Sequence, residues 1–188
     1  MTGGVAAGSG AFDALADFAR QQSELAWFAA VGEALTDGER AEGLDYAKAL
    51  GFTDAAIGMV ADWPAAERAT RGAGYEAWWS AENAERTALL ETATRMFGRH
   101  PVMTALTHVT EAVSTVVLGA ASVAAARSGV ADVALARVAA GAATEAAYHA
   151  GLARIAGAGA HHPFAVKFRL FAGGRWPLGI TGGILHLF

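Results

Sequence analysis

The stretch from Pro101 to Ala126 constrains this chain more than any other segment, because it carries a single formal charge. That charge is Glu111, and the stretch also holds one histidine, His108. A helix so poor in charge is normally buried on all sides. An unpaired carboxylate in a protein interior is too costly to keep. We therefore expect Glu111 to be buried and to contact a His or Arg from another helix.

The composition favours one helical domain with a sizeable core. The chain has 188 residues, of which 54% are hydrophobic and 17% charged, whereas about a quarter is the usual charged share. Alanine, the strongest helix former, dominates. The net charge is −4 without a basic stripe, which argues against a nucleic-acid partner. Two lysines against twelve arginines are typical of a GC-rich bacterial genome.

The cysteine count and the N-terminal sequence give an expectation for the cellular compartment. The chain has no cysteine, which excludes disulfides, iron–sulfur clusters and cysteine-based zinc sites. The first residues, MTGGVAAGSGAFDAL, lack the positive and apolar regions of a secretory signal, so we expect a cytoplasmic protein. The uncharged run 112–126 is rich in Ala, Ser and Thr and shorter than the about 20 apolar residues that a membrane span needs. Peripheral membrane association remains an alternative.

Caps and helix breakers divide the chain into about six helices. Residues 1–9 are rich in Gly, Ala and Ser and are expected to be disordered, ahead of a single domain at 10–188. Helices are predicted at 12–35, from the capping box at Thr36 to Gly51, and at 75–97, 101–128 and 130–158. Between them, Thr53 is predicted to cap a short helix that ends near Trp63. Pro64 then lies in the first turn of another piece, which Gly72 and Gly74 end.

Beyond His161 the pattern changes to that of strands. The segment FAVKFRLF alternates apolar residues, as a strand does, and Gly173-Gly174 and Gly182-Gly183 are predicted turns. Pro177 confines the segment between them to a sheet edge or a bulge. We therefore predict a mainly α fold: a multi-helix bundle with a short C-terminal antiparallel β hairpin or meander, a β tail at about 164–188.

Four side chains on the last two long helices form the first candidate site. If these helices make an antiparallel hairpin, the four lie within about one turn of a common level; they are His108, Glu111, Glu145 and His149. Two carboxylates and two imidazoles inside a bundle are suitable ligands for a divalent metal. The alternative is a buried hydrogen-bond network that fixes the register of the two helices.

The helix predicted at 75–97 carries the second candidate site. One face combines aromatic residues with an acid and a base at i,i+4 spacing: Trp78, Trp79, Glu82 and Arg86. This pattern predicts an aromatic-walled pocket for a small ligand. The alternative is an internal ion pair between Glu82 and Arg86 that aromatic side chains cover.

No motif in the sequence identifies a reaction, a nucleotide-binding loop or a nucleophile elbow. The apolar C-terminus, ILHLF, is expected to dock on the chain's own body or on a neighbour. The leading hypothesis is therefore a non-catalytic accessory or protein-interaction protein, a homo-oligomer or partner complex assembled through the β tail. The first alternative is a metal- or small-ligand-binding helical bundle, with or without catalysis, that uses the His/Glu site.

Overall fold

The computed structural model describes residues 3–69 and 75–188. In chain order its elements are α1 (Gly3–Arg20), the 3₁₀ helix η1 (Gln21–Glu24), α2 (Asp37–Ala49), β1 (Ala56–Met59), α3 (Trp63–Ala69), α4 (Tyr75–Phe97), α5 (Arg99–Arg127), α6 (Val133–Ile155), α7 (Pro163–Ala172), β2 (Pro177–Thr181) and β3 (Ile184–Leu187). The predicted mainly α fold with short C-terminal strands is confirmed.

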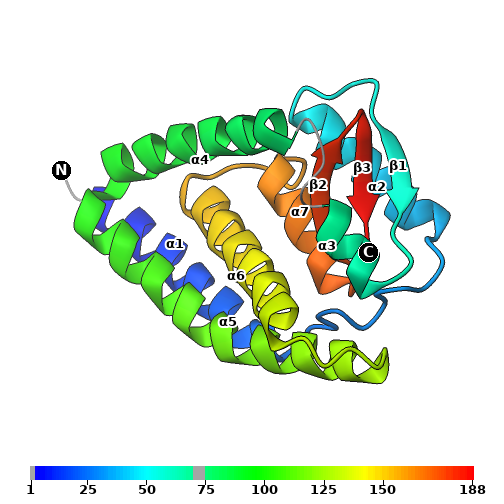
Figure 1. Ribbon diagram of the computed structural model, residues 1–188. Helices are drawn as coiled ribbons and strands as arrows, with labels where there is room; N and C mark the ends of the chain where they lie inside the picture. Colours follow the sequence, from blue (N-terminus) through cyan, green and yellow to red (C-terminus); the bar gives the residue numbers. More distant parts are fainter. Residues whose placement is uncertain (1–2, 70–74) are drawn as a thin grey trace.

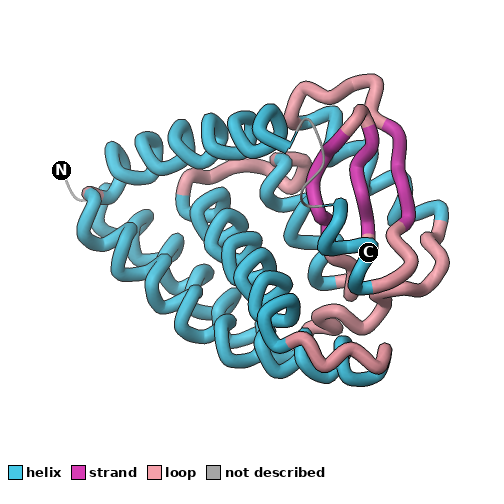
Figure 2. Tube along the Cα trace, in the orientation of Figure 1, coloured by secondary structure: helices cyan, strands magenta, loops and turns pink. Residues whose placement is uncertain are grey.

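The helices α1, α5 and α6 lie at one end of the molecule and the sheet at the other (Figures 1 and 2). At one end α5 and α6 form the predicted antiparallel hairpin, and α1 packs against both. At the other end α2 and α7 pack together beside the sheet. The helix α4 contacts α5, α6 and β2, and α7 contacts α6 as well as α2. The larger hydrophobic cluster extends from the helical end to residues next to the sheet such as Trp176 and Phe188, and the smaller one lies between α2, α7 and the sheet.

The helix α5 is buried on one face only, which corrects the prediction for this segment. Leu106 and four of its valines face the core, with Val109 and Val113 fully buried. The side chain of Glu111 is 67% exposed and its partner is His108 of the same helix, with Nδ1 and Oε2 3.6 Å apart. The prediction of a buried, cross-helix Glu111 is wrong.

Uncharged polar residues account for that error. The outer face of α5 carries Ser and Thr where other helices carry charges, and their hydroxyls bond to carbonyls of their own helix. Thr107 Oγ1 donates to Met103 O at 3.0 Å, and Ser122 Oγ donates to Leu118 O at 2.7 Å. A low charge content therefore did not mean burial, because small neutral polar side chains supply a face that tolerates water.

By length and composition, α5 could also cross a membrane. Its most apolar window has a mean hydropathy of 1.6, and 33% of that window is buried inside the protein. The core helix of a soluble protein meets the same criterion. Peripheral membrane association therefore remains a hypothesis.

The segment predicted as the first strand of the β tail is the helix α7. His162 caps this helix by accepting a hydrogen bond at Nδ1 from Phe164 N at 3.2 Å, and Pro163 occupies its first turn. Seven of the ten residues of α7 are buried, including Val166, Lys167 and Leu170. A helix buried on most sides is apolar at almost every position, so its sequence also contains the alternation of a strand.

The sheet has the order β1-β3-β2, with β3 parallel to β1 and antiparallel to β2. Pro177 lies on the edge strand β2, at a register shift before Gly179, so both predicted placements of this proline hold. Gly182 and Gly183 make the β2–β3 turn with φ of 57° and 76°, values that glycine adopts without strain. The predicted helix from Thr53 is wrong, because β1 occupies that segment and pairs with β3.

The apolar tail is buried in the chain's own sheet. β3 is the central strand, and Leu185, Leu187 and Phe188 are at most 1% exposed. The tail therefore docks on the chain's own body, which is one of the two expected outcomes. Assembly with a second copy or a partner stays a prediction. The tail no longer supports it, because the tail is buried within its own chain.

Several local predictions can be compared directly with the structure. The capping box of Thr36 and Glu39 has both reciprocal hydrogen bonds, and α4 has the predicted bounds. The predicted helix 12–35 instead ends at η1, after which Phe28 takes a φ of 58° and is buried. α1 begins at Gly3, inside the segment predicted to be disordered. Residues 1–2, Gly72 and Gly74 lie outside the described residues.

Candidate functional site

A small polar pocket lies between α4 and α6. Its volume is about 140 Å³. The lining residues come from one face of each helix: Trp79, Glu82, Asn83 and Arg86 of α4, and Glu145 and His149 of α6. The i,i+3, i,i+4 and i,i+7 spacings explain why each set shares a face. The pocket thus joins parts of the two sites that the sequence suggested separately.

Below the pocket, Glu82 anchors a buried network that links α4, α7 and α2. Lys167 Nζ of α7 donates to both carboxylate oxygens of Glu82, at 2.7 and 2.8 Å. Tyr46 Oη of α2 donates to Glu82 Oε1 at 2.6 Å and accepts from Trp78 Nε1 at 2.6 Å. Glu82 and Lys167 are 4% and 2% exposed. The network therefore fixes one wall of the pocket from the inside.

The electrostatics of this network keep Tyr46 protonated and Glu82 charge-compensated. Burial raises the pKa of Tyr46 well above its usual value, and the neighbouring Glu82 carboxylate adds to the effect. A neutral Tyr46 hydroxyl is the donor that Glu82 needs, while the Lys167 ammonium balances the carboxylate charge. Lys167 also lies 4.9 Å from the centre of the Trp78 ring, a favourable cation–π distance. We infer that this network is structural and internally satisfied.

His149 differs from this network because its imidazole is buried without a hydrogen-bond partner. It is 2% exposed, and among the described residues neither Nδ1 nor Nε2 finds a partner. The ring stacks on Phe164 of α7, with centroids 4.1 Å apart and planes at 9°. Burial, then the positive charges of Lys167 and Arg86, lower the pKa of His149 to about 2. The imidazole is therefore neutral, with one N–H donor and one acceptor unused.

The rim of the pocket carries opposite charges. Arg86 is half-buried and donates from Nη2 to Asn83 Oδ1 at 2.6 Å. Glu145 is exposed, and the part of the chain that the structure describes offers it no ion pair. Its charge is felt by Tyr75, whose pKa is raised by burial and then by Glu145. Trp79 covers the outside of the pocket and is 54% exposed.

The four predicted metal ligands are not brought together. The side chains of His108 and Glu111 are mostly exposed on α5, away from α6, whereas Glu145 and His149 line the pocket. Within residues 3–69 and 75–188 no group of three or more His, Cys, Asp or Glu side chains is placed to hold a metal ion. The valine face of α5 makes the contact with α6, so His108 and Glu111 point away from it. The predicted four-ligand cluster is therefore corrected to two separate pairs.

The aromatic-walled pocket predicted on α4 is found in part. Trp79, Glu82 and Arg86 line the cavity, while Trp78 is buried and belongs to the network below it. Glu82 pairs with Lys167 and Arg86 with Asn83, so the predicted Glu82–Arg86 ion pair is absent from the described contacts.

Sequence reasoning missed Tyr46, Asn83 and Lys167. Lys167 carried a usable signal, because it is one of two lysines in the chain and interrupts the apolar run FAVKFRLF. A lone lysine inside such a run indicates a buried partner of opposite charge.

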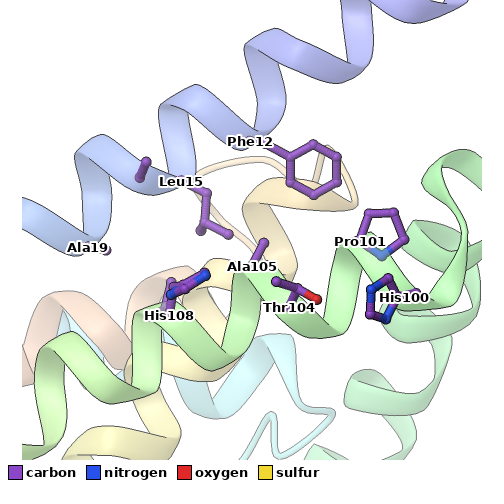
Figure 3. A pocket seen from close by; sticks show the side chains of 10 residues that line it. Phe12, Leu15, Ala19, His100, Pro101, Thr104, Ala105 and His108 are labelled. Atoms are coloured by element: carbon purple, nitrogen blue, oxygen red, sulfur yellow. The ribbon is translucent and has the colours of Figure 1, made fainter.

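A larger hollow, of about 440 Å³, lies between α1 and α5. Figure 3 shows Phe12 and Leu15 of α1 on one side and His100, Thr104 and His108 along α5 on the other. The side-chain atoms that lack partners in the described interior belong to other residues: Gln22, Trp63 and His149. We therefore place the candidate site at the smaller polar pocket, because His149 lines it and lacks hydrogen-bond partners.

The neutral state of His149 predicts a stability that falls in acid. The unfolded ring binds a proton near pH 6.5 and the folded ring only near pH 2. Below pH 6.5 the unfolded chain therefore holds the extra proton, and stability drops by about 1.4 kcal/mol per pH unit. Between pH 6.5 and 5 we expect a loss of about 2 kcal/mol from this residue.

Urea unfolding at pH 7, 6 and 5 measures this loss. His149→Phe should have a shallower pH dependence than the wild-type protein by that amount. His162 and His186, whose pKa values are also lowered by burial, are present in both proteins, so the difference isolates His149. Parallel pH dependences would mean that folding leaves the pKa of His149 unchanged, and would contradict the buried neutral ring.

Comparisons with protein-family models, with curated proteins and with solved structures gave no match for this chain. Among the residues of the site, His149 is the one whose buried polar atoms lack hydrogen-bond partners.

Proposed function

We propose that this protein binds a small polar molecule in the pocket between α4 and α6, and that His149 holds it. One observation supports the proposal above all: a fully buried imidazole lines this pocket with both nitrogens unpartnered. Leaving a buried donor or acceptor unpaired costs about 1–3 kcal/mol per group. Native proteins rarely carry that cost, and a bound molecule removes it.

The surroundings of His149 suit a preorganised binding site. Phe164 holds the ring in one plane by stacking, and Lys167 and Tyr46 hold Glu82 in place on the opposite helix. A site whose side chains are already fixed loses little conformational entropy when a ligand arrives. The volume of about 140 Å³ admits a molecule of roughly five to ten non-hydrogen atoms.

The protonation state of His149 favours binding over acid–base catalysis. An effective general acid or base has a pKa near the working pH, and the pKa of this ring is about 2. At neutral pH the imidazole offers one donor and one acceptor instead. These match a ligand group that itself has both, such as an amide, a hydroxyl or an amino-acid end.

Binding of small polar probes tests the proposal. We would titrate acetamide, acetate, methylamine and glycine separately into ¹⁵N-labelled protein and follow the His149 side-chain signals by NMR. At least one probe should bind saturably to the wild-type protein and about tenfold more weakly to His149→Phe. Phe keeps an aromatic ring to stack on Phe164 and removes both nitrogens.

The same variant separates ligand binding from a structural role. His149→Phe should melt at the same temperature as the ligand-free wild type or higher, because it removes two unsatisfied polar atoms. If His149→Phe binds the probes as the wild type does, or if no probe binds either protein, the proposal is wrong. A clearly lower melting temperature would also count against it, since it would mean that the nitrogens have partners inside the chain.

The interaction hypothesis remains a separate proposal. A homo-oligomer would need a surface other than the tail, and the outer face of α5 has exposed apolar residues such as Leu118 and Val123. The molar mass from light scattering during gel filtration tests it.

A further inference from the structure

The pocket contains two unpaired charges of opposite sign as well as His149. Arg86 and Glu145 both line it, and they come from different helices, α4 and α6. Neither forms an ion pair with the other or with any charged group in the described part of the chain. No described ion pair joins them although both line the same cavity, so each is available to a ligand bound there.

The other charges near the pocket cancel. Glu82 is neutralised by Lys167 in direct contact, and His149 carries no charge at neutral pH. The pocket therefore presents one free cation, Arg86, and one free anion, Glu145, with no net charge. A simple anion or a simple cation would satisfy one of these side chains and leave the other unpaired.

Arg86 lines the pocket and is held by Asn83. Asn83 Oδ1 accepts a hydrogen bond from Nη2 of the guanidinium, which fixes the group and leaves its other N–H donors unassigned. Guanidinium groups bind carboxylates through two parallel hydrogen bonds. Glu145, on the facing helix, is a suitable partner for an ammonium group.

We propose that the ligand is a short zwitterion of the α-amino-acid class, with its carboxylate on Arg86 and its ammonium on Glu145. The inference rests on the proposed function, because it assumes that this pocket binds a ligand. His149 then contributes a hydrogen bond to one end of the molecule. Trp79, at the exposed edge, is the wall along which a larger side chain of the ligand would leave the cavity.

Four probes with the same short skeleton test the assignment. Glycine has both charges, acetate only the carboxylate, methylamine only the ammonium, and acetamide neither. The proposal predicts that glycine binds the wild-type protein about tenfold or more tightly than each of the other three. Affinities are measured by NMR titration at constant ionic strength.

Two variants give opposite patterns with these probes. Arg86→Gln should weaken glycine and acetate about tenfold and leave methylamine unchanged. Glu145→Gln should weaken glycine and methylamine to a similar degree and leave acetate unchanged. The matched controls are Arg95→Gln and Glu91→Gln on α4. Arg95 donates to Thr92 three residues earlier, as Arg86 donates to Asn83, but it lies outside the pocket.

The outcomes distinguish this inference from the function on which it rests. If acetamide or acetate binds in a His149-dependent manner and glycine binds no tighter, the zwitterion assignment is wrong and ligand binding stands. If glycine binds more tightly but Arg86→Gln and Glu145→Gln do not change its affinity, the assignment is also wrong. If no probe binds the wild-type protein, both proposals fall. The expected pattern in both variants, with unchanged controls, supports both.

Discussion

Replacing Lys167 by methionine is expected to lower the free energy of unfolding by about 3–5 kcal/mol, the usual cost of removing one partner from a buried ion pair. Lys167 and Glu82 are both almost fully buried, and the ammonium contacts both carboxylate oxygens. Methionine fills a similar volume, so the loss reports on the uncompensated charge of Glu82 more than on packing. Urea unfolding at pH 7 measures it.

Two further variants show whether this loss comes from the ion pair. Lys167→Met combined with Glu82→Gln should recover part of the stability, because no buried charge remains. Glu111→Ala, which removes an exposed carboxylate beside His108, should change stability by no more than about 0.5 kcal/mol. A loss below 1 kcal/mol for Lys167→Met would contradict the buried pair.

Deletion of Gly183–Phe188 should abolish cooperative folding. The deletion removes β3, the central strand, and leaves β1 and β2 without a partner between them. It also removes Leu185, Leu187 and Phe188, which are at most 1% exposed. Each such side chain contributes about 1.5–3 kcal/mol by burial, so together they approach the 5–15 kcal/mol that stabilises a whole domain. Circular dichroism during heating, with solubility, measures the result.

Single substitutions in the same strand provide a graded control. Leu187→Ala should cost about 2–5 kcal/mol, as truncations of buried Leu do. Ile184→Ala should cost clearly less, since Ile184 is 37% exposed. A truncated protein that melts cooperatively at the wild-type temperature would show that the tail packs against nothing.

Local signals predicted the local structure well. Thr36 and Glu39 identify a helix start because both residues of a capping box lie within four residues of sequence. Pro177 identifies an edge strand because proline lacks the N–H that a central strand needs. The bounds of α4 follow from its own periodicity. In each case the signal depends on a single residue or on residues close in sequence.

Predictions failed where distant partners decide the structure. β1 is a strand because Ala56 pairs with Ile184 from the far end of the chain, and nothing in the sequence around Thr53 records that pairing. The alternation in FAVKFRLF is compatible with a strand and with a buried helix, and burial against α2 and α6 selects the helix α7.

The sequence predicted the two sides of the candidate site, on α4 and α6, as parts of separate sites. Periodicity placed Glu82 and Arg86 on one face of α4, and Glu145 and His149 on one face of α6. The packing of α4 against α6, which depends on the whole fold, joins these faces. His108 and Glu111 were assigned to the same site because they lie at the same level along the helix hairpin. Their side chains are exposed on α5 and point away from α6.

The most direct test of ligand binding by His149 is an atomic-resolution crystal structure of the protein grown with glycine, compared with one grown without it. In the glycine-grown crystal we expect density for one continuous molecule in the cavity between α4 and α6, with an atom at hydrogen-bond distance from a His149 ring nitrogen and its ends on Arg86 and Glu145. A cavity that holds only separate water molecules in both crystals, or an imidazole turned to bond within its own chain, would contradict it.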